Sequence, residues 1–122
     1  MERPEPILPA PGEEEIWKTH PVYTAYEVST FGNVRRISTQ YMMTSSIGSR
    51  GYTFVHLRVG IDNPAGKYVR THKLVADTFL GPCPDGLEID HLDRNRRNNY
   101  YKNLCYCTHK ENMENTSKKR RK

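Results

Sequence analysis

The sequence predicts an α+β fold, in which an N-terminal antiparallel β hairpin or sheet module precedes a strand, loop, strand and helix unit. The first half of the chain holds short runs of alternating apolar and polar residues, separated by turn-forming residues. One amphipathic helical pattern follows at residues 71–81, and the strand, loop, strand and helix pattern spans residues 87–117. The 122 residues leave room for one small compact unit.

Charge is distributed unevenly along the chain. The formal net charge is +5, but residues 1–15 carry five acids and one base, whereas residues 91–122 carry ten bases and three acids. A basic surface attracts polyanions and speeds their association, which favours nucleic acid over an anionic membrane surface as the partner. No apolar run is long enough to span a bilayer and no signal peptide is evident, so a soluble, cytoplasmic protein is expected.

The two ends of the chain differ in composition from the region between them. Residues 1–12 contain four of the eight prolines and no usable periodicity, which predicts an extended, disordered leader outside the fold. Residues 118–122 are all basic and predict a frayed tail. Between these ends, residues 13–70 are predicted to form a β-rich module and residues 71–117 the second unit.

Turn residues divide the β-rich module into strands. A tight turn near residues 31–33 predicts a first hairpin. Residues 52–59 alternate strictly, so one face of that strand should be buried and the other accessible. NPAG at residues 63–66 predicts a turn, and residues 67–72 return as another strand. The simplest arrangement of these strands is an antiparallel sheet.

The second unit begins with a helix and continues with two strands. Apolar residues at helical spacing predict a short helix over residues 71–81. A strand at residues 87–91, a long polar loop at residues 92–102 and a return strand at residues 104–107 follow. A last helix closes the unit, and the capping box that opens it consists of Thr108 and Glu111.

The stretch from residue 89 to residue 112 concentrates the chemistry. It holds an adjacent Asp90–His91 pair, then Asn103 twelve residues after His91, then Asn112 nine residues further. A carboxylate is a hard oxygen ligand for a divalent cation, and an imidazole beside it is a possible general base. The two amides could orient or complete such a site.

Three segments in this order, HKLVADTFL, GLEIDHLDRNRRNNYYKNL and CTHKEN, resemble the HNH endonucleases in their His-Asn-Asn form, found in small phage and intron-borne homing endonucleases. The resemblance covers residues 71–117. The earlier WKTHPVYTAYEVSTFGNVRRI resembles the short β module that often precedes this nuclease core. The resemblance implies a ββα-metal (His-Me finger) nuclease core and a phage-type enzyme that hydrolyses DNA phosphodiester bonds to 5′-phosphate and 3′-hydroxyl ends.

The same resemblance implies a role for each residue of the motif. His91 is the general base that takes a proton from the attacking water, and Asn103 pins the loop and helps to orient His91. Asp90 and Asn112 are ligands of one divalent cation, Mg²⁺ or Mn²⁺. The chemistry agrees, because an unperturbed His pKa of about 6.5 lies near working pH and these oxygens are hard donors. Neighbouring residues of a regular strand point to opposite faces, so a bulge or twist is predicted at Asp90 and His91.

The polar loop offers further side chains that each allow two interpretations. Asn98 and Asn99 are interpreted as amides that bond the local backbone rather than as part of the chemistry. Arg94, Arg96 and Arg97 could contact DNA phosphates, although a solvated run of charge is nearly as good an explanation.

The β module offers further arginines and histidines. Antiparallel ribbons can enter a groove and present alternate side chains to bases or phosphates, and the resemblance implies this role here. Ordinary strand composition is the blander explanation. His20 and His56 are interpreted as surface or sheet residues, whereas His72 could approach the active site from the helix. The candidate DNA contacts in this module are Arg35, Arg36 and Arg58.

The cysteines allow a structural zinc site as an alternative to reduced thiols. Cys83, Cys105 and Cys107 are an odd number in a short chain, so a disulfide framework is not expected. Together with His109 they would supply three thiolates and one imidazole to zinc. The C-x-C spacing is shorter than that of the usual zinc knuckle and a fourth Cys is missing. We therefore favour small thiols that fill the core.

The favoured function is a metal-dependent endonuclease that acts on double-stranded DNA. A monomer would nick one strand, a homodimer could cut both, and a targeting protein is another possible partner. The alternative is a non-catalytic DNA-binding or assembly module on the same scaffold. It predicts salt-sensitive DNA binding without cleavage.

Overall fold

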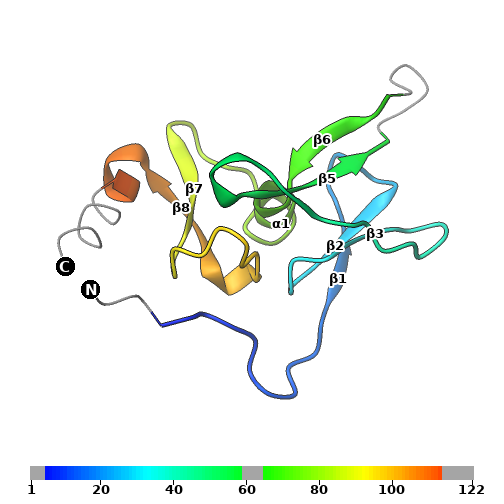
Figure 1. Ribbon diagram of the computed structural model, residues 1–122, viewed down its shortest axis with the longest axis horizontal. Helices are drawn as coiled ribbons and strands as arrows, with labels where there is room; N and C mark the ends of the chain where they lie inside the picture. The colour runs from blue at the N-terminus through cyan, green and yellow to red at the C-terminus, as the bar shows by residue number, and fades with distance from the viewer. Residues whose placement is uncertain (1–4, 59–64, 114–122) are drawn as a thin grey trace.

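The computed structural model describes residues 5–58 and 65–113, which form two small antiparallel sheets, a helix and a two-stranded hairpin (Figure 1). The α+β fold class is therefore confirmed. The N-terminal strands form two three-stranded sheets, β1-β2-β3 and β4-β5-β6, where a single sheet was the simplest expectation. In the part of the chain that the structure describes, no helix is long and apolar enough to cross a membrane.

The first sheet contains β1 (Trp17–Thr19), β2 (Tyr26–Ser29) and β3 (Val34–Arg36). β2 and β3 pair antiparallel around a tight turn, which confirms the predicted hairpin. Gly32 lies in this turn with φ of +88°, a conformation that glycine adopts at little cost. A Cβ at Gly32 would stand 2.9 Å from the Cβ of Asn99, so the hairpin turn packs directly against the polar loop.

The second sheet contains β4 (Ser46–Ile47), β5 (Thr53–Leu57) and β6 (Lys67–Arg70). β5 buries Thr53, Val55 and Leu57 and leaves the residues between them on the accessible face, as the alternation predicts. The predicted turn at residues 63–66 falls mostly outside the described residues. The β4-β5-β6 sheet thus has one face on the core and one face toward solvent.

Helix α1 (Thr71–Phe79) follows β6 directly and lies at the centre of the fold. It packs against β2, β5, β6, β7 and β8, and Figure 1 shows it between the β7–β8 hairpin and the two N-terminal sheets. A single buried cluster joins these elements through Tyr26, Val28, Val34, Val55, Leu57, Val69, Leu74, Val75 and Leu104. The helix ends at Phe79, two residues earlier than predicted, and Gly81 then takes φ of +86°.

The C-terminal hairpin consists of β7 (Leu87–His91) and β8 (Leu104–Thr108), as predicted, and a short 3-10 turn, Tyr101–Asn103, precedes β8. Residues 109–113 are helical. The backbone N–H of Thr108 donates to Oε1 of Glu111 (2.8 Å), and the backbone N–H of Glu111 donates to Oγ1 of Thr108 (3.1 Å). The capping box is therefore confirmed. The predicted basic tail lies outside the described residues.

The N-terminal segment 5–12 has no helix or strand, as expected of a proline-rich leader. It is nevertheless tied to the polar loop: the backbone N–H of Ile7 donates to Oδ2 of Asp93 (3.3 Å), and Nδ2 of Asn98 donates to the carbonyl of Ile7 (2.8 Å). The expectation that the leader stands outside the fold therefore does not hold at Ile7. The first four residues lie outside the described part.

His20 occupies an unexpected place at the end of β1. It is 1% exposed, so His20 is not a surface residue, but its backbone N–H donates to the carbonyl of Tyr26 and continues the pairing of β1 with β2, as a sheet residue would. His56 lies on the accessible face of β5. Nδ1 of His20 accepts the backbone N–H groups of Val22 (3.1 Å) and Tyr23 (2.9 Å). Its Nε2 lies 3.0 Å from Oδ2 of Asp77 on α1. One imidazole thus fastens the β1–β2 loop to the central helix.

We expect His20→Ala to lower the free energy of unfolding by about 2–3 kcal/mol, because two backbone donors and Oδ2 of Asp77 lose the imidazole as their partner. Urea denaturation of both proteins measures the change. His109→Ala is the matched control, because the His109 side chain is 74% exposed and its loss should change stability by less than about 0.5 kcal/mol. Equal stability of the two variants would contradict the assigned role of His20.

Candidate active site

A polar cavity of about 420 Å³ opens between the β7–β8 hairpin and the end of the second sheet. It is bordered by five of the residues singled out in the sequence: Asp90, His91, Arg94, Arg96 and Asn112. Arg50, Tyr52, Arg70 and His72 form its opposite side. Strand β7 (Leu87–His91) supplies Asp90 and His91, the polar loop supplies Arg94 and Arg96, and the helical residues 109–113 supply Asn112. We call this site the polar cavity.

Asp90 and His91 border this cavity from a regular strand. β7 pairs with β8 residue for residue, with Asp90 opposite Cys105 and His91 opposite Leu104. Of the two predicted alternatives, a bulge or a twist, the bulge is therefore wrong, and the twist stays a prediction. A two-stranded ribbon twists more strongly than a wide sheet, and His91 is the last residue of β7, which allows neighbouring side chains to reach one cavity.

The ring of His91 is held by Asn99. Nε2 of His91 lies 3.0 Å from Oδ1 of Asn99, and Nδ2 of Asn99 donates to Oγ1 of Thr53 on β5 (2.9 Å). An amide oxygen only accepts, so Nε2 carries the proton and Nδ1 keeps the lone pair of the neutral ring. The interpretation of Asn99 as a local backbone partner is thus wrong. The sequence did not indicate that Asn99 is buried or that it lies beside His91, because the loop is uniformly polar.

Asn103 closes the polar loop at its base. It is fully buried, and its Oδ1 accepts the backbone N–H of Asp93 (2.9 Å) while its Nδ2 donates to Oδ1 of Asp93 (3.0 Å) and to the carbonyl of Asn98 (2.8 Å). The Asn98 amide accepts the backbone N–H of Tyr100 (3.2 Å), as its interpretation as a local partner predicts. Asn103 therefore pins the loop, and Asn99 is the residue in contact with the His91 ring.

Arg94 lies between the two predicted cation ligands. Its Nη1 is 2.6 Å from Oδ1 of Asp90 and 3.4 Å from Oδ1 of Asn112. Arg94 has φ of +65°, and its backbone N–H bonds the carbonyl of His91 (2.9 Å), so a tight turn folds the side chain back toward β7. The two oxygen atoms therefore converge on one cationic group.

The donor set suits a hard divalent cation. One carboxylate and one amide oxygen converge, and few protein ligands leave room for water and phosphate oxygens, as Mg²⁺ prefers. Within residues 5–58 and 65–113, no cluster of three or more His, Cys, Asp or Glu is arranged to hold a metal ion. Nδ2 of Asn112 donates to Oε1 of Glu88 (2.7 Å), and this hydrogen bond lowers the pKa of Glu88. Glu88 is a cavity residue that the motif did not indicate.

Burial keeps two of the histidines that border the cavity, His91 and His72, neutral. It lowers the pKa of His91 below its ordinary value, although the bond to Asn99 and the nearby Asp90 and Asp93 oppose the shift. Burial and the neighbouring His91 lower the pKa of His72 to about 3. The two rings stand 5.2 Å apart edge to face, so His72 reaches the cavity from the first turn of α1, as expected.

Arginines surround the mouth of the polar cavity. The guanidinium carbons of Arg70 and Arg96 lie 4.5 Å and 4.7 Å from the ring centre of Tyr52, and Nη1 of Arg96 donates to the carbonyl of Arg50 (2.7 Å). These contacts hold positive charge beside His91. Arg50 and Arg70 were not among the predicted DNA contacts of the β module, and the structure places both at this cavity. Arg97 is exposed on the loop.

The predicted contacts of the β module lie elsewhere. Arg35 pairs with Glu27 and stacks on Trp17, with 3.9 Å from its guanidinium carbon to the ring centre. Arg36 and Arg58 border a separate depression of about 550 Å³. The structure thus brings Arg96 to the polar cavity and leaves Arg35, Arg36 and Arg58 outside it.

The three cysteines are free thiols. Burial raises the pKa of Cys107 to about 11 and also raises that of Cys105. Zinc ligation requires the thiolate, which burial disfavours here. The environment of Cys105 and Cys107 thus suits the interpretation as core-filling thiols, whereas Cys83 is exposed, so that interpretation is wrong for Cys83.

Comparison with known proteins identifies both halves of the chain. Residues 69–114 match the family model of the HNH endonucleases, and residues 15–58 match the NUMOD4 motif. The chain is 36% identical over 100 residues to the DNA endonuclease I-HmuI of Bacillus phage SP01, covering 81% of this chain and 56% of that protein. It is 32% identical over 108 residues to the H-N-H endonuclease F-TflII of Escherichia phage T5, covering 87% of this chain and 54% of that one.

The fold points to the same relatives. The solved structure that describes DNA binding and cleavage by the HNH homing endonuclease I-HmuI superimposes with a TM-score of 0.76 at 34% identity, over 85% of this chain and 59% of that one. The chain spans a little more than half the length of these relatives. The matching domain, N-terminal motif and fold show that the chain carries an HNH endonuclease domain at residues 69–114, preceded by a NUMOD4 motif at residues 15–58.

Proposed function

We propose that this protein is a metal-dependent DNA endonuclease that hydrolyses a phosphodiester bond to 5′-phosphate and 3′-hydroxyl ends. One observation carries the proposal: a buried, neutral imidazole and two converging oxygen ligands border the same cavity in a chain that carries an HNH endonuclease domain. Its relatives I-HmuI and F-TflII are named as endonucleases, and the cavity offers this chain the groups for such a reaction.

His91 supplies the base in this proposal. With Nε2 engaged by Asn99, the lone pair on Nδ1 takes a proton from a water molecule, and the resulting hydroxide attacks phosphorus as the 3′ oxygen leaves. Asn103 contributes by holding the loop that carries Asn99. General base catalysis of this kind is worth about 10²–10⁴-fold in rate.

Asp90 and Asn112 would hold one divalent cation, with Mg²⁺ or Mn²⁺ the best match to their oxygens. Such a cation polarises the phosphate and stabilises the leaving oxygen. Because the Arg94 guanidinium contacts the same two oxygens, we infer that it competes with the cation and turns toward a DNA phosphate when the cation binds.

Double-stranded DNA is the proposed substrate. The guanidinium groups of Arg50, Arg70 and Arg96 at the cavity mouth would contact phosphates near the cut, and exposed Arg97 lies on the same loop. The β module of residues 13–70 would contact flanking DNA through Arg35, Arg36 and Arg58, and residues 71–117 would form the nuclease core. One polar cavity per chain predicts a nick by a monomer and a double-strand cut by a dimer, acting inside the host cell.

The proposal predicts that the protein nicks supercoiled plasmid in Mg²⁺ or Mn²⁺ and that chelation abolishes the activity. His91→Ala should lower the nicking rate by about 100-fold or more, and Asp90→Asn should do the same through loss of the charged ligand. Asp85→Asn, the same change at an exposed loop position, should leave the rate unaltered. DNA binding by the wild-type protein without nicking in any divalent ion would instead identify a non-catalytic DNA-binding module.

Asn99 is expected to act through His91 as a positioning residue. Asn99→Leu should lower kcat by about 10–100-fold with little change in KM, because the ring loses its acceptor. Asn99→Asp keeps an oxygen facing Nε2 and should recover most of that loss. Single-turnover nicking measures the chemical step and thermal melting measures stability, so together they distinguish a misplaced His91 ring from a destabilised loop. Equal losses in both variants would show that Asn99 serves only the packing of the loop.

Competition between Arg94 and the cation can be measured without DNA. Arg94→Ala should tighten Mn²⁺ binding by about threefold to tenfold, since it removes a positive charge from between the ligand oxygens. Arg97→Ala, from the exposed side of the same loop, should leave the affinity unchanged. Titration calorimetry reports both values. Weaker Mn²⁺ binding by Arg94→Ala would contradict the proposed competition.

A further inference from the structure

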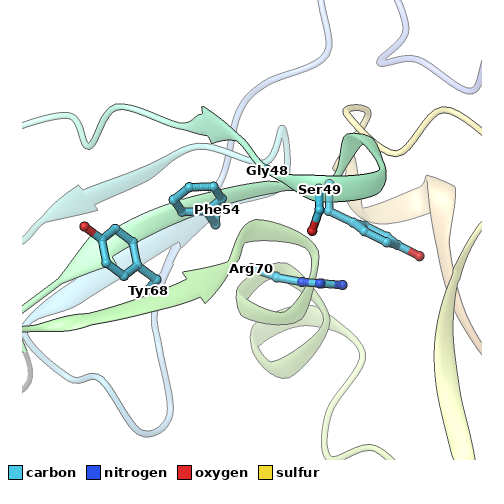
Figure 2. A pocket seen from close by; sticks show the side chains of 6 residues that line it. Gly48, Ser49, Phe54, Tyr68 and Arg70 are labelled. Atoms are coloured by element: carbon cyan, nitrogen blue, oxygen red, sulfur yellow. The ribbon is translucent and has the colours of Figure 1, made fainter.

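A second cavity of about 380 Å³ lies beside the polar cavity, on the accessible face of the β4-β5-β6 sheet. We call it the aromatic cavity. Its lining consists of Gly48, Ser49, Tyr52, Phe54, Tyr68 and Arg70 (Figure 2). Tyr52 and Arg70 also border the polar cavity, so the two cavities share a wall.

Aromatic rings form one side of this cavity. Phe54 and Tyr68 project from neighbouring strands and contact each other edge to face, with ring centres 5.4 Å apart. Tyr68 is 68% exposed, so it contributes little to the hydrophobic core. A Cβ atom at position 48 would lie 2.9 Å from the Phe54 ring, so the absence of a side chain at Gly48 leaves room for this ring. The sheet therefore presents aromatic surface that folding alone does not require.

Positive charge forms the other side. Arg70 is opposite Phe54 in the strand register, and Figure 2 shows its side chain running beneath Ser49, away from Tyr68. Its guanidinium lies 4.5 Å from the ring centre of Tyr52, which holds it in place. A nucleotide combines a flat aromatic base with an anionic phosphate. The rings of Phe54 and Tyr68 are complementary to the base, and the guanidinium of Arg70 is complementary to the phosphate.

We propose that the aromatic cavity receives one unstacked nucleobase of the DNA strand that is cut, an inference that rests on the proposed nuclease function. Both faces of a base in a regular duplex are covered by its neighbours, so an aromatic ring can stack on it only after it leaves the stack. The planes of Phe54 and Tyr68 lie at 78° to each other, and His56 already stacks on Tyr68, so a base that stacks on one of the two rings meets the other by its edge. Arg70 then pairs with the phosphate of the same strand. The cavity is therefore a nucleobase subsite next to the reacting phosphate.

The shared wall limits which base can enter. The ring centres of Tyr52 and His91 are 6.0 Å apart, and successive nucleotides of one strand rise by about 3.4 Å along the helix axis. The base beyond Tyr52 therefore belongs to a nucleotide within about three positions of the phosphate at His91. A mismatched base leaves the stack more easily than a paired one, so a mismatch at this position should strengthen binding.

The test first maps the position of the nick on plasmid DNA. It then uses duplexes that carry a single mismatch, or a single 2-aminopurine, at each of the three positions on either side of the nick. Binding is measured with the full chain in Ca²⁺, so that the duplex stays uncut. One position is expected to show about tenfold tighter binding when mismatched, and a rise in 2-aminopurine fluorescence when the protein binds.

Substitutions assign the effect to the aromatic cavity. Tyr68→Ala and Phe54→Ala should each reduce the mismatch advantage and the fluorescence rise at that position by at least about threefold. Tyr41→Ala removes another exposed tyrosine, 60% exposed, and should leave both signals unchanged. The proposal is overturned if wild-type protein binds and nicks without any responding position, or if the response persists in both variants. A wild-type protein that never nicks would instead disprove the nuclease function itself.

Discussion

The candidate site depends on one buried hydrogen bond, between Nε2 of His91 and Oδ1 of Asn99. It selects the tautomer that leaves the lone pair on Nδ1, and it exists only because the polar loop is held in one path. Asn103 supplies that restraint with three side-chain hydrogen bonds beneath the loop. The close approach of Gly32 to Asn99 adds a steric restraint from the first hairpin. Orientation of the base is therefore a property of the whole loop.

Electrostatics divides the polar cavity into two parts. Burial keeps His91 and His72 neutral, which suits proton transfer from water. The carboxylate of Asp90, with a side chain 3% exposed, is balanced by Arg94 at 2.6 Å. A buried carboxylate without a cation would carry a large desolvation cost, so an internal cation at this position lets the chain fold before a metal ion arrives. In the proposed reaction, the contact between Asp90 and Arg94 is thus the one that a divalent cation would replace.

The sequence predicted what depends on local pattern and missed what depends on the path of the chain. The bounds of β7 and the capping box of Thr108 and Glu111 follow from alternation and spacing, which are properties of neighbouring residues. The left-handed turn at Arg94, by contrast, aims a loop arginine inward, and no alternation or spacing indicates it. The role of Asn99 requires knowing that Thr53, 46 residues away, lies beside it. Neither the inward turn at Arg94 nor the contact between Asn99 and Thr53 produces a periodic pattern in the sequence.

Three consecutive residues, Tyr52 and the first two residues of β5, connect the β module to the C-terminal hairpin. Thr53 points to the buried side, where its hydroxyl accepts the Asn99 amide that orients His91. Phe54 points to the opposite face and lines the aromatic cavity, as strand alternation requires. Tyr52 stands between the two cavities and fixes Arg70 and Arg96. A displacement of this strand would therefore move the His91 ring and the aromatic cavity together, which would couple the proposed DNA contact to the geometry of the proposed base.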